Sequence, residues 1–208
     1  ELKTDLRWQS LAPVLEGKMP LLIQANHVSQ ITAAITWTKR RGYKMVLLGG
    51  WDSWMVADQL RENDIPVIIG GLHRVPGRRW EAYDELYTLP AKLYAAGVRY
   101  CLSPTENYDN VRNLPYEAGT AVAFGLPREE AVKAITLYPA RILGIDHQVG
   151  SLDPGKDATL IVTSGDPLDI RSQVERLFIR GGKVDLGSRH KSLYRKYSER
   201  HRQLGISP

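Results

Sequence analysis

Two histidines and two carboxylates follow short apolar runs in the first half of the chain. His27 follows the run MPLLIQAN, His73 follows IPVIIGG, and Glu106 and Asp109 follow GVRYCLS. Imidazole and carboxylate groups ligate transition metals, and a carboxylate can also act as a general acid or base. We therefore predict a candidate metal site at His27 and His73 with Glu106 and Asp109 as catalytic carboxylates. The alternative is that each is an ordinary surface residue of a loop.

Aromatic and basic residues in the same connections are candidates for substrate contact. They are three tryptophans and three arginines, Trp51, Trp54, Trp80, Arg74, Arg78 and Arg79. The tryptophans could line a pocket, although tryptophan is also common in a partly buried core. The arginines could hold an anionic substrate or be solvated. Ser103 has no base at a recognisable spacing, so nucleophilic catalysis has no support.

Four apolar runs, each followed by a helix-compatible stretch, must position these residues. The runs span Met19 to Asn26, Tyr43 to Gly50, Ile65 to Gly71 and Gly97 to Ser103. Continuous apolar residues bounded by Gly and Pro fit strands buried on both faces of a parallel sheet. Their spacing, about 20 to 30 residues, is that of a βα unit. The sequence therefore predicts an α/β fold with His27 and His73 near the carboxyl ends of strands.

The helices and the second half of the chain are predicted from caps and turns. The stretch SQITAAITWTKRRG is predicted as a helix with Ser29 as N-cap and Gly42 at its end. WDSWMVADQLREND, YEAGTAVAFG and PREEAVKAITLYPARILG are also predicted to be helical. After residue 144, short β-branched runs separated by DPGK, SGDP and RGGK predict a small antiparallel β element.

Residues Asn113 to Asp169 resemble the C-terminal segment of the amidohydrolase superfamily, particularly its imidazolonepropionase-like branch. The resemblance rests on two patterns, AIT-x-x-PA-x-x-LG from Ala134 to Gly144 and V-G-S-L-x-P-G-K-D-A from Val149 to Ala158, followed by a hydrophobic strand and GDPL. The preceding βα units match more loosely, so the resemblance covers most of residues 10 to 185. These patterns identify relatives and do no chemistry themselves.

The resemblance implies that the chain is the C-terminal half of a TIM-like (β/α)8 barrel. Residues 1–144 would then form strands five to eight with closing helices, residues 145–187 a β-sandwich element, and residues 188–208 a basic tail. Half a barrel leaves strand edges unpaired and its inner face exposed. We therefore expect the upstream half of the barrel, or a second copy of the chain, as a partner.

The resemblance also implies hydrolysis of non-peptide C–N bonds, in amides or cyclic amides, by water activated on a divalent metal such as zinc. It places metal ligands at Gln24, Gly49 and Thr105, and often a further histidine at Asn26. An amide oxygen is a poor ligand beside imidazole, and glycine has no ligating side chain. We therefore expect a degenerate metal site. The predicted substrate-binding residues are Gln24, Asn26, Trp51, Arg74 and Thr105.

Three functions remain open at this point. The first is an amidohydrolase-type protein or fragment with a degenerate site. The second is a working hydrolase whose upstream strands supply metal ligands with help from His27 or Glu106. The third is a non-catalytic binding or assembly subunit that partners an active paralogue.

Composition and charge exclude several classes of protein. The chain has 208 residues, of which 43% are hydrophobic and 25% charged, so disorder is excluded as the main state. No apolar run approaches the roughly 18 residues of a membrane span, and no signal pattern is present. We expect a soluble protein, and the single cysteine, Cys101, leaves cytoplasm and periplasm open. Because the chain begins with Glu1 rather than Met, it could be a piece of a longer protein.

The positive charge is confined to the C-terminal tail. Residues 188 to 203 carry six Lys and Arg against Glu199, a net +5 that equals the net charge of the whole chain. Such a run is typical of a solvated or docking helix, with an anionic partner as the alternative. We expect neither nucleic acid nor membrane as a partner, and a small molecule as substrate if the protein is active.

Overall fold

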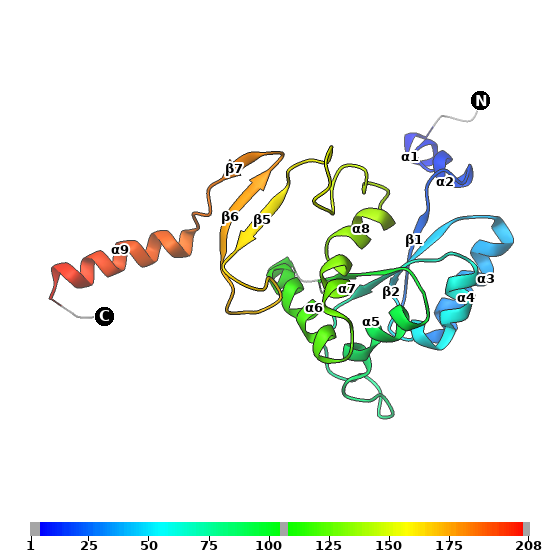
Figure 1. Ribbon diagram of the computed structural model, residues 1–208. Coiled ribbons are helices and arrows are strands. Elements are labelled where there is room, and N and C mark those ends of the chain that lie inside the picture. Colours follow the sequence, from blue (N-terminus) through cyan, green and yellow to red (C-terminus); the bar gives the residue numbers. More distant parts are fainter. Residues whose placement is uncertain (1–4, 105–107, 206–208) are drawn as a thin grey trace.

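Four parallel strands form one sheet and confirm the four predicted strands (Figure 1). In order across the sheet they are β1 (Leu21–Ala25), β2 (Met45–Gly49), β3 (Val67–Gly70) and β4 (Tyr100–Ser103). The computed structural model describes residues 5–104 and 108–205. Because neighbouring strands are parallel and consecutive, their carboxyl ends meet at one edge of the sheet, which we call the carboxyl edge.

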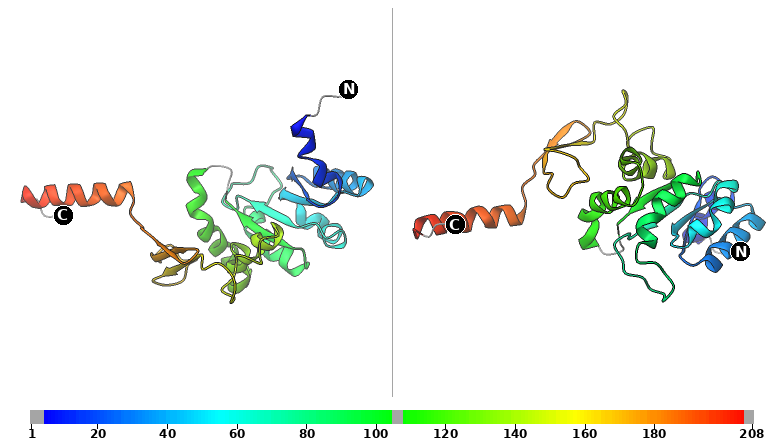
Figure 2. Two further views of the ribbon diagram at one scale, coloured as in Figure 1. Left: turned by 90° about the horizontal axis from the view of Figure 1, so that it is seen from above. Right: turned by 60° about the horizontal axis from the view of Figure 1, so that its bottom comes forward.

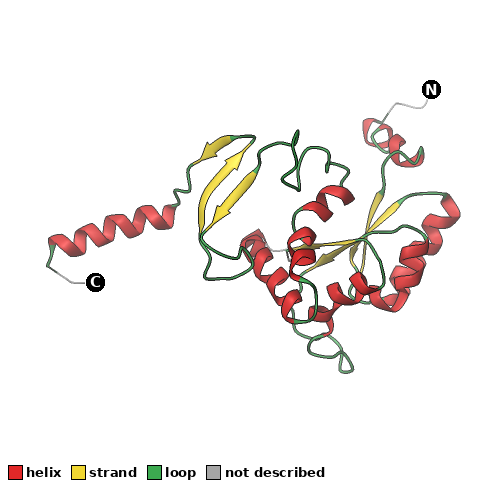
Figure 3. Ribbon diagram, in the orientation of Figure 1, coloured by secondary structure: helices red, strands yellow, loops and turns green. Residues whose placement is uncertain are grey.

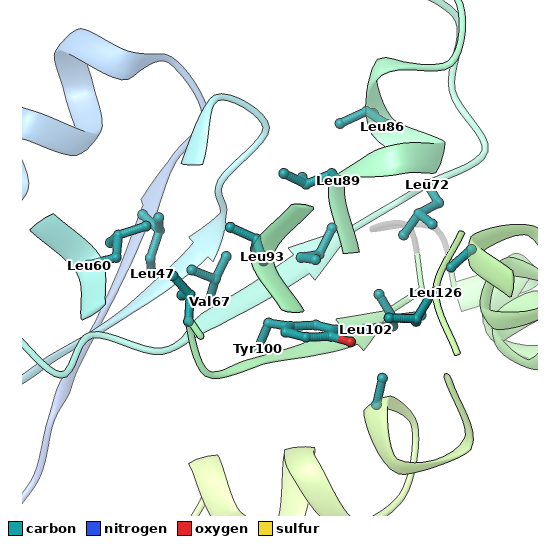
Figure 4. Packing of buried hydrophobic residues seen from close by; sticks show 14 of the residues in the cluster. Leu47, Leu60, Val67, Leu72, Leu86, Leu89, Leu93, Tyr100, Leu102 and Leu126 are labelled. Carbon is teal, nitrogen blue, oxygen red and sulfur yellow. The ribbon is translucent and has the colours of Figure 1, made fainter. Parts of the chain in front are cut away.

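Three helices connect these strands and cover one face of the sheet (Figure 3). They are α3 (Val28–Arg41), α4 (Ala57–Glu62), which follows the short 3-10 helix η1 (Ser53–Val56), and α5 (Glu85–Ala95). Figure 4 shows Leu60, Leu89 and Leu93 packed with strand residues such as Leu47 and Val67, all fully buried. Each such side chain contributes about 1.5–3 kcal/mol to folding.

The opposite face of the parallel sheet is less covered. Along β1, Leu22 is 58% exposed and Gln24 is exposed, whereas Ala25 on the other face is buried. Within the described chain β1 pairs with β2 alone and β4 with β3 alone, so the sheet keeps two unpaired edges. This is the geometry expected of strands that need further strands or a covering partner.

Helix α3 begins two residues earlier than predicted, so the prediction of Ser29 as N-cap is wrong. The N-cap is His27, whose backbone N–H donates to the side chain of Gln30 at 3.2 Å. The N–H of Val28 donates to Asp52, 24 residues away, at 3.0 Å. The predicted end is confirmed, because Gly42 adopts φ +69°, the left-handed conformation common at C-caps.

The helical prediction after Pro127 holds only in part, because the segment divides into α7 (Arg128–Ala134) and α8 (Leu137–Ile142). The cause is Pro139, whose ring would clash with the carbonyl of Ile135 in a continuous helix. The remaining short elements of this region and of the N-terminus are α1 (Leu6–Gln9), α2 (Ala12–Leu15), η2 (Tyr108–Asn113) and α6 (Leu114–Ala123).

A separate antiparallel sheet confirms the predicted β element. It contains β5 (Leu160–Thr163), β6 (Val174–Ile179) and β7 (Gly182–Val184). Arg180 and Gly181 join β6 to β7 with φ of +49° and +77°, as a two-residue type I′ turn requires. The described residues form a single layer here, so the second layer of a sandwich stays a prediction.

The basic tail forms a helix, α9 (Arg189–Gln203), which extends away from the rest of the molecule in every view (Figure 2). Ser188 caps its N-terminus by accepting from the N–H of Lys191 at 3.2 Å. No residue of α9 is buried. Among the described helices, none combines the length and apolar character needed to cross a bilayer.

Candidate functional site

A network of charged and aromatic side chains lies at the carboxyl edge, and we call it the carboxyl-edge cluster. Its members come from the residues that follow β1, from the start of the β2–η1 turn and from the long β3–α5 connection. They are Asn26, His27, Trp51, Asp52, Arg74, Arg78 and Glu81. The sheet brings these segments together because parallel strands end at the same edge.

Asp52 and Arg78 form the centre of the carboxyl-edge cluster. Asp52 is 1% exposed, and its two carboxylate oxygens accept from Arg78 Nη2 at 2.5 Å and Nη1 at 2.8 Å. Burial alone would raise the pKa of Asp52, but the hydrogen bonds from Arg78 and from the N–H of Val28 outweigh it and lower that pKa. Asp52 is therefore a buried carboxylate that stays charged because it is paired.

His27 touches the same ion pair. Its Nδ1 lies 3.2 Å from Arg78 Nη1 and 3.8 Å from Asp52 Oδ2. Because a guanidinium only donates hydrogen bonds, Nδ1 accepts from Arg78, and the neutral ring carries its proton on Nε2. The ring meets Trp51 edge-on at 6.4 Å between centroids. The side chain is 48% exposed, so Nε2–H is the group it can offer to a ligand.

A second buried ion pair stabilises the conformation of the β3–α5 connection. Glu81 accepts from Arg74 Nη2 at 2.6 Å and from the backbone N–H groups of Gly77 and Arg78 at 2.8 and 3.2 Å. Burial would raise the pKa of Glu81, but the Gly77 N–H and the charge of Arg74 outweigh it and lower that pKa. The connection is thus held by charge-assisted hydrogen bonds to its own backbone.

Both arginines of the carboxyl-edge cluster also stack on tryptophans. The guanidinium of Arg74 lies 3.7 Å from the Trp51 ring centroid, and that of Arg78 lies 4.1 Å from that of Trp80. The indole of Trp51 donates to the carbonyl of Gly70 at 3.4 Å. Flat cation–aromatic surfaces of this kind suit a planar ligand group. Trp54, the third candidate tryptophan, has its ring centroid 4.5 Å from Lys92 Nζ and packs against the hydrophobic core, as Trp51 also does.

The side chain of Asn26 packs directly against Gly49. Gly49 has φ +94°, and a Cβ at this residue would lie 2.2 Å from Asn26 Oδ1. That oxygen is buried and has no hydrogen-bond partner among the described residues. The amide of Asn26 therefore occupies the space that a side chain at position 49 would enter, and position 49 requires glycine.

His73 faces a different element from His27. Its Nε2 lies 2.8 Å from Thr120 Oγ1 in α6, and its ring meets Tyr87 edge-on. One turn earlier in α6, Glu117 accepts from the N–H of Leu72 at 3.2 Å and is 1% exposed. Burial raises the pKa of Glu117. Helix α6 thus anchors the start of the β3–α5 connection.

The structure brings together some of the predicted site residues. Within the carboxyl-edge cluster, Trp51 contacts both His27 and Arg74, and Asn26 lies over Gly49. Gln24 is exposed on the open face of β1. Thr105 and Glu106 lie outside the described residues, and Asp109 is described only as part of the backbone of η2, so their predicted roles stay predictions.

The described residues do not fit a divalent metal ion. No group of three or more His, Cys, Asp or Glu side chains in this part of the chain is arranged to hold one. The Nδ1 of His27 faces Arg78, and the Nε2 of His73 bonds to Thr120. Gly49 offers no side chain, as the sequence already indicates.

Sequence reasoning missed two buried carboxylates of the site, Asp52 and Glu81. Asp52 stands three residues after the end of β2, the same kind of position that drew attention to His27. Glu81 lies among three arginines of the β3–α5 connection, and this charge pattern was a usable signal for an ion-pair network.

Comparisons with a family model and with curated proteins identify relatives of this chain. The model of the amidohydrolase family matches residues 107–185. Amidohydrolase tasK of Hapsidospora irregularis is 28% identical over 187 residues, which are 86% of this chain and 19% of that protein. A putative N-acetylgalactosamine-6-phosphate deacetylase of Escherichia coli K12 is 39% identical over 57 residues, 27% of this chain and 31% of that protein.

Solved structures extend the match to the parallel sheet. An amidohydrolase from Thermotoga maritima MSB8 has 32% identity and a TM-score of 0.81, over 89% of this chain and 48% of that one. A Xaa-Pro dipeptidase with bound methionine has 19% identity and a TM-score of 0.62, over 84% and 47%, which shows the fold alone. The chain spans about half the length of these solved structures and less of the curated relatives.

The family match over the β element and the structural match over the parallel sheet agree with the resemblance carried by the AIT-x-x-PA-x-x-LG and V-G-S-L-x-P-G-K-D-A patterns. They do not single out the imidazolonepropionase-like branch. Together these matches support membership of this mixed α/β chain in the amidohydrolase superfamily.

Proposed function

We propose that this chain supplies strands five to eight of an amidohydrolase-type (β/α)8 barrel, and that the protein containing it hydrolyses a non-peptide C–N bond in a small amide or cyclic amide. The observation that carries the proposal is the four-stranded parallel sheet, with helices on one face and charged side chains gathered at its carboxyl edge. Active sites of (β/α)8 barrels lie at this edge.

The upstream half of the barrel is the partner that this geometry favours. Leu22 is 58% exposed on the open face, and both sheet edges are unpaired within the described chain. Four further strands would cover the open face and pair both edges. A second copy of this chain is the other occupant that could do so.

The role proposed for the carboxyl edge is to bind and orient substrate. Trp51 and Arg74 form a flat stacked surface, and His27 offers an exposed imidazole beside it. A planar amide group can stack on such a surface and accept a hydrogen bond from Nε2–H of His27. Since the described residues do not fit a metal, we assign this edge no step of metal chemistry.

Steady-state kinetics of the full-length protein test this role. We expect turnover of at least one substrate in a panel of dipeptides, imidazolones and cyclic amides, with kcat/KM lowered about tenfold or more by Trp51→Ala and Arg74→Ala. Arg79→Ala is the matched control, because Arg79 is an exposed neighbour outside the carboxyl-edge cluster. Turnover that neither substitution affects would remove the substrate-binding role.

A non-catalytic binding or assembly subunit is the second candidate function. It is favoured by the internal pairing of the carboxyl-edge cluster, in which Asp52 neutralises Arg78 and Glu81 neutralises Arg74. The absence of turnover on the whole panel would favour this candidate.

Helix α9 supplies an interaction surface for this second candidate. Leu193 and Tyr197 share one side of the helix with Leu204 just past its end, and they are 37%, 48% and 61% exposed. The helix also carries six Lys and Arg residues, and by helical spacing Arg200 lies on the same side as Leu193. An apolar stripe flanked by cations fits an anionic partner.

Removing residues 188–208 should abolish salt-sensitive binding to a polyanion without changing the thermal stability of the remainder, because no residue of α9 is buried. Retention on immobilised heparin across a sodium chloride gradient measures the first effect, and thermal unfolding measures the second. Equal retention of the full and shortened chains would make the tail irrelevant to anionic partners.

A further inference from the structure

We infer that the carboxyl-edge cluster selects a substrate group that carries no charge, a neutral amide or cyclic amide rather than one that bears a free carboxylate. The observation behind this inference is that a buried carboxylate of this chain neutralises each arginine of the cluster, Glu81 for Arg74 and Asp52 for Arg78. The inference rests on the proposed function, since it names the class of substrate that the same edge would take.

The guanidinium of Arg78 has no free fork for an anionic ligand. Its Nη1 and Nη2 donate to the two oxygens of Asp52, and Nη1 also lies 3.2 Å from Nδ1 of His27. Its Nε lies 3.7 Å from Glu81 Oε2, and the Trp80 ring covers one face. Arginine recognises a carboxylate best through two parallel N–H donors. In this chain Asp52 already takes the place that a ligand carboxylate would need.

The guanidinium of Arg74 is enclosed in a similar way. Its Nη2 donates to Glu81 at 2.6 Å, its Nη1 donates to the carbonyl of Val75 at 3.3 Å, and one face lies on the Trp51 ring. Its Nε is buried and has no hydrogen-bond partner among the described residues, so a ligand in solvent cannot reach it. Arg74 therefore contributes a flat surface whose charge is compensated within the chain.

The members of the carboxyl-edge cluster carry no net charge together. Two arginines stand against two carboxylates, and His27 is neutral when its Nδ1 accepts from Arg78. Although burial would raise the pKa of Asp52 and of Glu81, the hydrogen bonds and arginine charges around them lower it, so both stay ionised. A substrate carboxylate here would lose its hydration without gaining a free counter-charge, and it would lie near two like charges.

The groups that this edge does offer are neutral. They are the Nε2–H of the half-exposed His27 ring and the faces of tryptophan rings, of which Trp80 is 62% exposed. An imidazole N–H can donate to an amide carbonyl, and an indole face can stack on a planar amide. The sequence left open whether the arginines of the β3–α5 connection hold an anionic substrate, and the pairing of Arg74 and Arg78 favours an uncharged one.

Matched pairs of ligands test the inference on the full-length protein, by isothermal titration calorimetry at about pH 8, where imidazole is ordinarily neutral. One pair is pyroglutamate and its amide, which share a cyclic amide ring and differ only in a carboxylate against a neutral carboxamide. The other pair is N-acetylglycine and its amide, which differ in the same way without a ring. We expect the native protein to bind the neutral member of at least one pair about tenfold more tightly than the anionic member.

Glu81→Gln should move this preference toward the anion. It removes the charge that neutralises Arg74 and keeps an oxygen that can accept from the backbone N–H groups of Gly77 and Arg78. The ratio of the two dissociation constants should therefore shift by about tenfold in favour of the anionic ligand.

The matched control is Asp58→Asn, which also frees an arginine from its ion pair. That arginine, Arg61, donates to the carbonyl of Ala96 ahead of β4, at the end of the sheet opposite the carboxyl edge. The ratio of dissociation constants should stay unchanged in Asp58→Asn. It should also stay unchanged in Arg79→Ala, which removes an exposed cation outside the carboxyl-edge cluster.

Three results would overturn the inference. They are an anionic ligand that binds the native protein as tightly as its neutral partner, no binding of any of the four ligands, and a ratio that moves no further in Glu81→Gln than in Asp58→Asn. If circular dichroism shows that Glu81→Gln does not fold, the comparison on the native protein decides alone. Binding of a neutral ligand without hydrolysis of any substrate in the panel would support the inference and count against the proposed hydrolysis, so the two failures are distinguishable.

Discussion

Replacing Asp52 with alanine should lower the free energy of unfolding by about 3 kcal/mol, because it breaks a buried ion pair by removing one partner. The substitution leaves Arg78, whose side chain is 23% exposed, without its bidentate acceptor. It also removes the acceptor for the N–H of Val28 at the start of α3. Urea denaturation followed by circular dichroism measures the loss.

The matched control is Asp58→Ala. Asp58 pairs with Arg61 at 2.7 Å, a distance similar to that of the buried pair, but their side chains are 79% and 48% exposed. Exposed pairs contribute about 0–1 kcal/mol, so the control should lose little. Equal losses in the two variants would show that burial of the Asp52–Arg78 pair does not matter.

The pH dependence of stability should report the same ion pair. Since the pKa of Asp52 is lowered in the folded protein, the stability that it contributes is fully present above the unfolded value of about 3.9. That contribution is lost as pH falls through the folded pKa. Asp52→Asn should therefore flatten the acid limb of the stability curve below about pH 4, and an unchanged limb would contradict the assignment.

Replacing Gly49 with alanine should cost about 2–4 kcal/mol of stability, through backbone strain and a steric clash. The residue has φ +94°, and the new Cβ would lie 2.2 Å from Asn26 Oδ1. Gly70→Ala is a close control, because Gly70 also ends a strand of the same sheet but a Cβ added there would meet nothing within 4 Å. The control should change stability by less than about 1 kcal/mol.

The double variant Asn26→Ala with Gly49→Ala separates the two causes. Removing the Asn26 amide relieves the clash and leaves the backbone strain, so part of the loss should return. A double-mutant cycle from urea denaturation measures this coupling. Strictly additive losses would show that the two side-chain positions do not share one space.

This packing has a consequence for the metal-ligand positions. A histidine at position 49, where the family resemblance implies a ligand, would meet the same oxygen of Asn26 and the same positive φ. A histidine introduced at position 49 would therefore require Asn26 to change with it.

Local sequence determined the elements of the fold. The four apolar runs between Met19 and Ser103 became the four strands, because continuous apolar residues bounded by Gly and Pro favour strands of a parallel sheet. The expectation that all four are buried on both faces is wrong for β1, where Leu22 and Gln24 are exposed. The RGGK turn became the β6–β7 hairpin, since its residues tolerate positive φ. The superfamily could also be predicted from the sequence, because its patterns have fixed spacing along the chain.

The site is formed by contacts between segments that are distant in the sequence. Only the tertiary structure decided which of these segments meet. Asp52 caps α3 from 24 residues away and binds Arg78 from 26 residues away, so neither partner is visible in a local window of sequence. The same contacts moved the start of α3 to Val28 and turned His27 toward a guanidinium rather than toward His73. Spacing along the chain places residues at one edge of a sheet, but burial and charge pairing decide which of them meet.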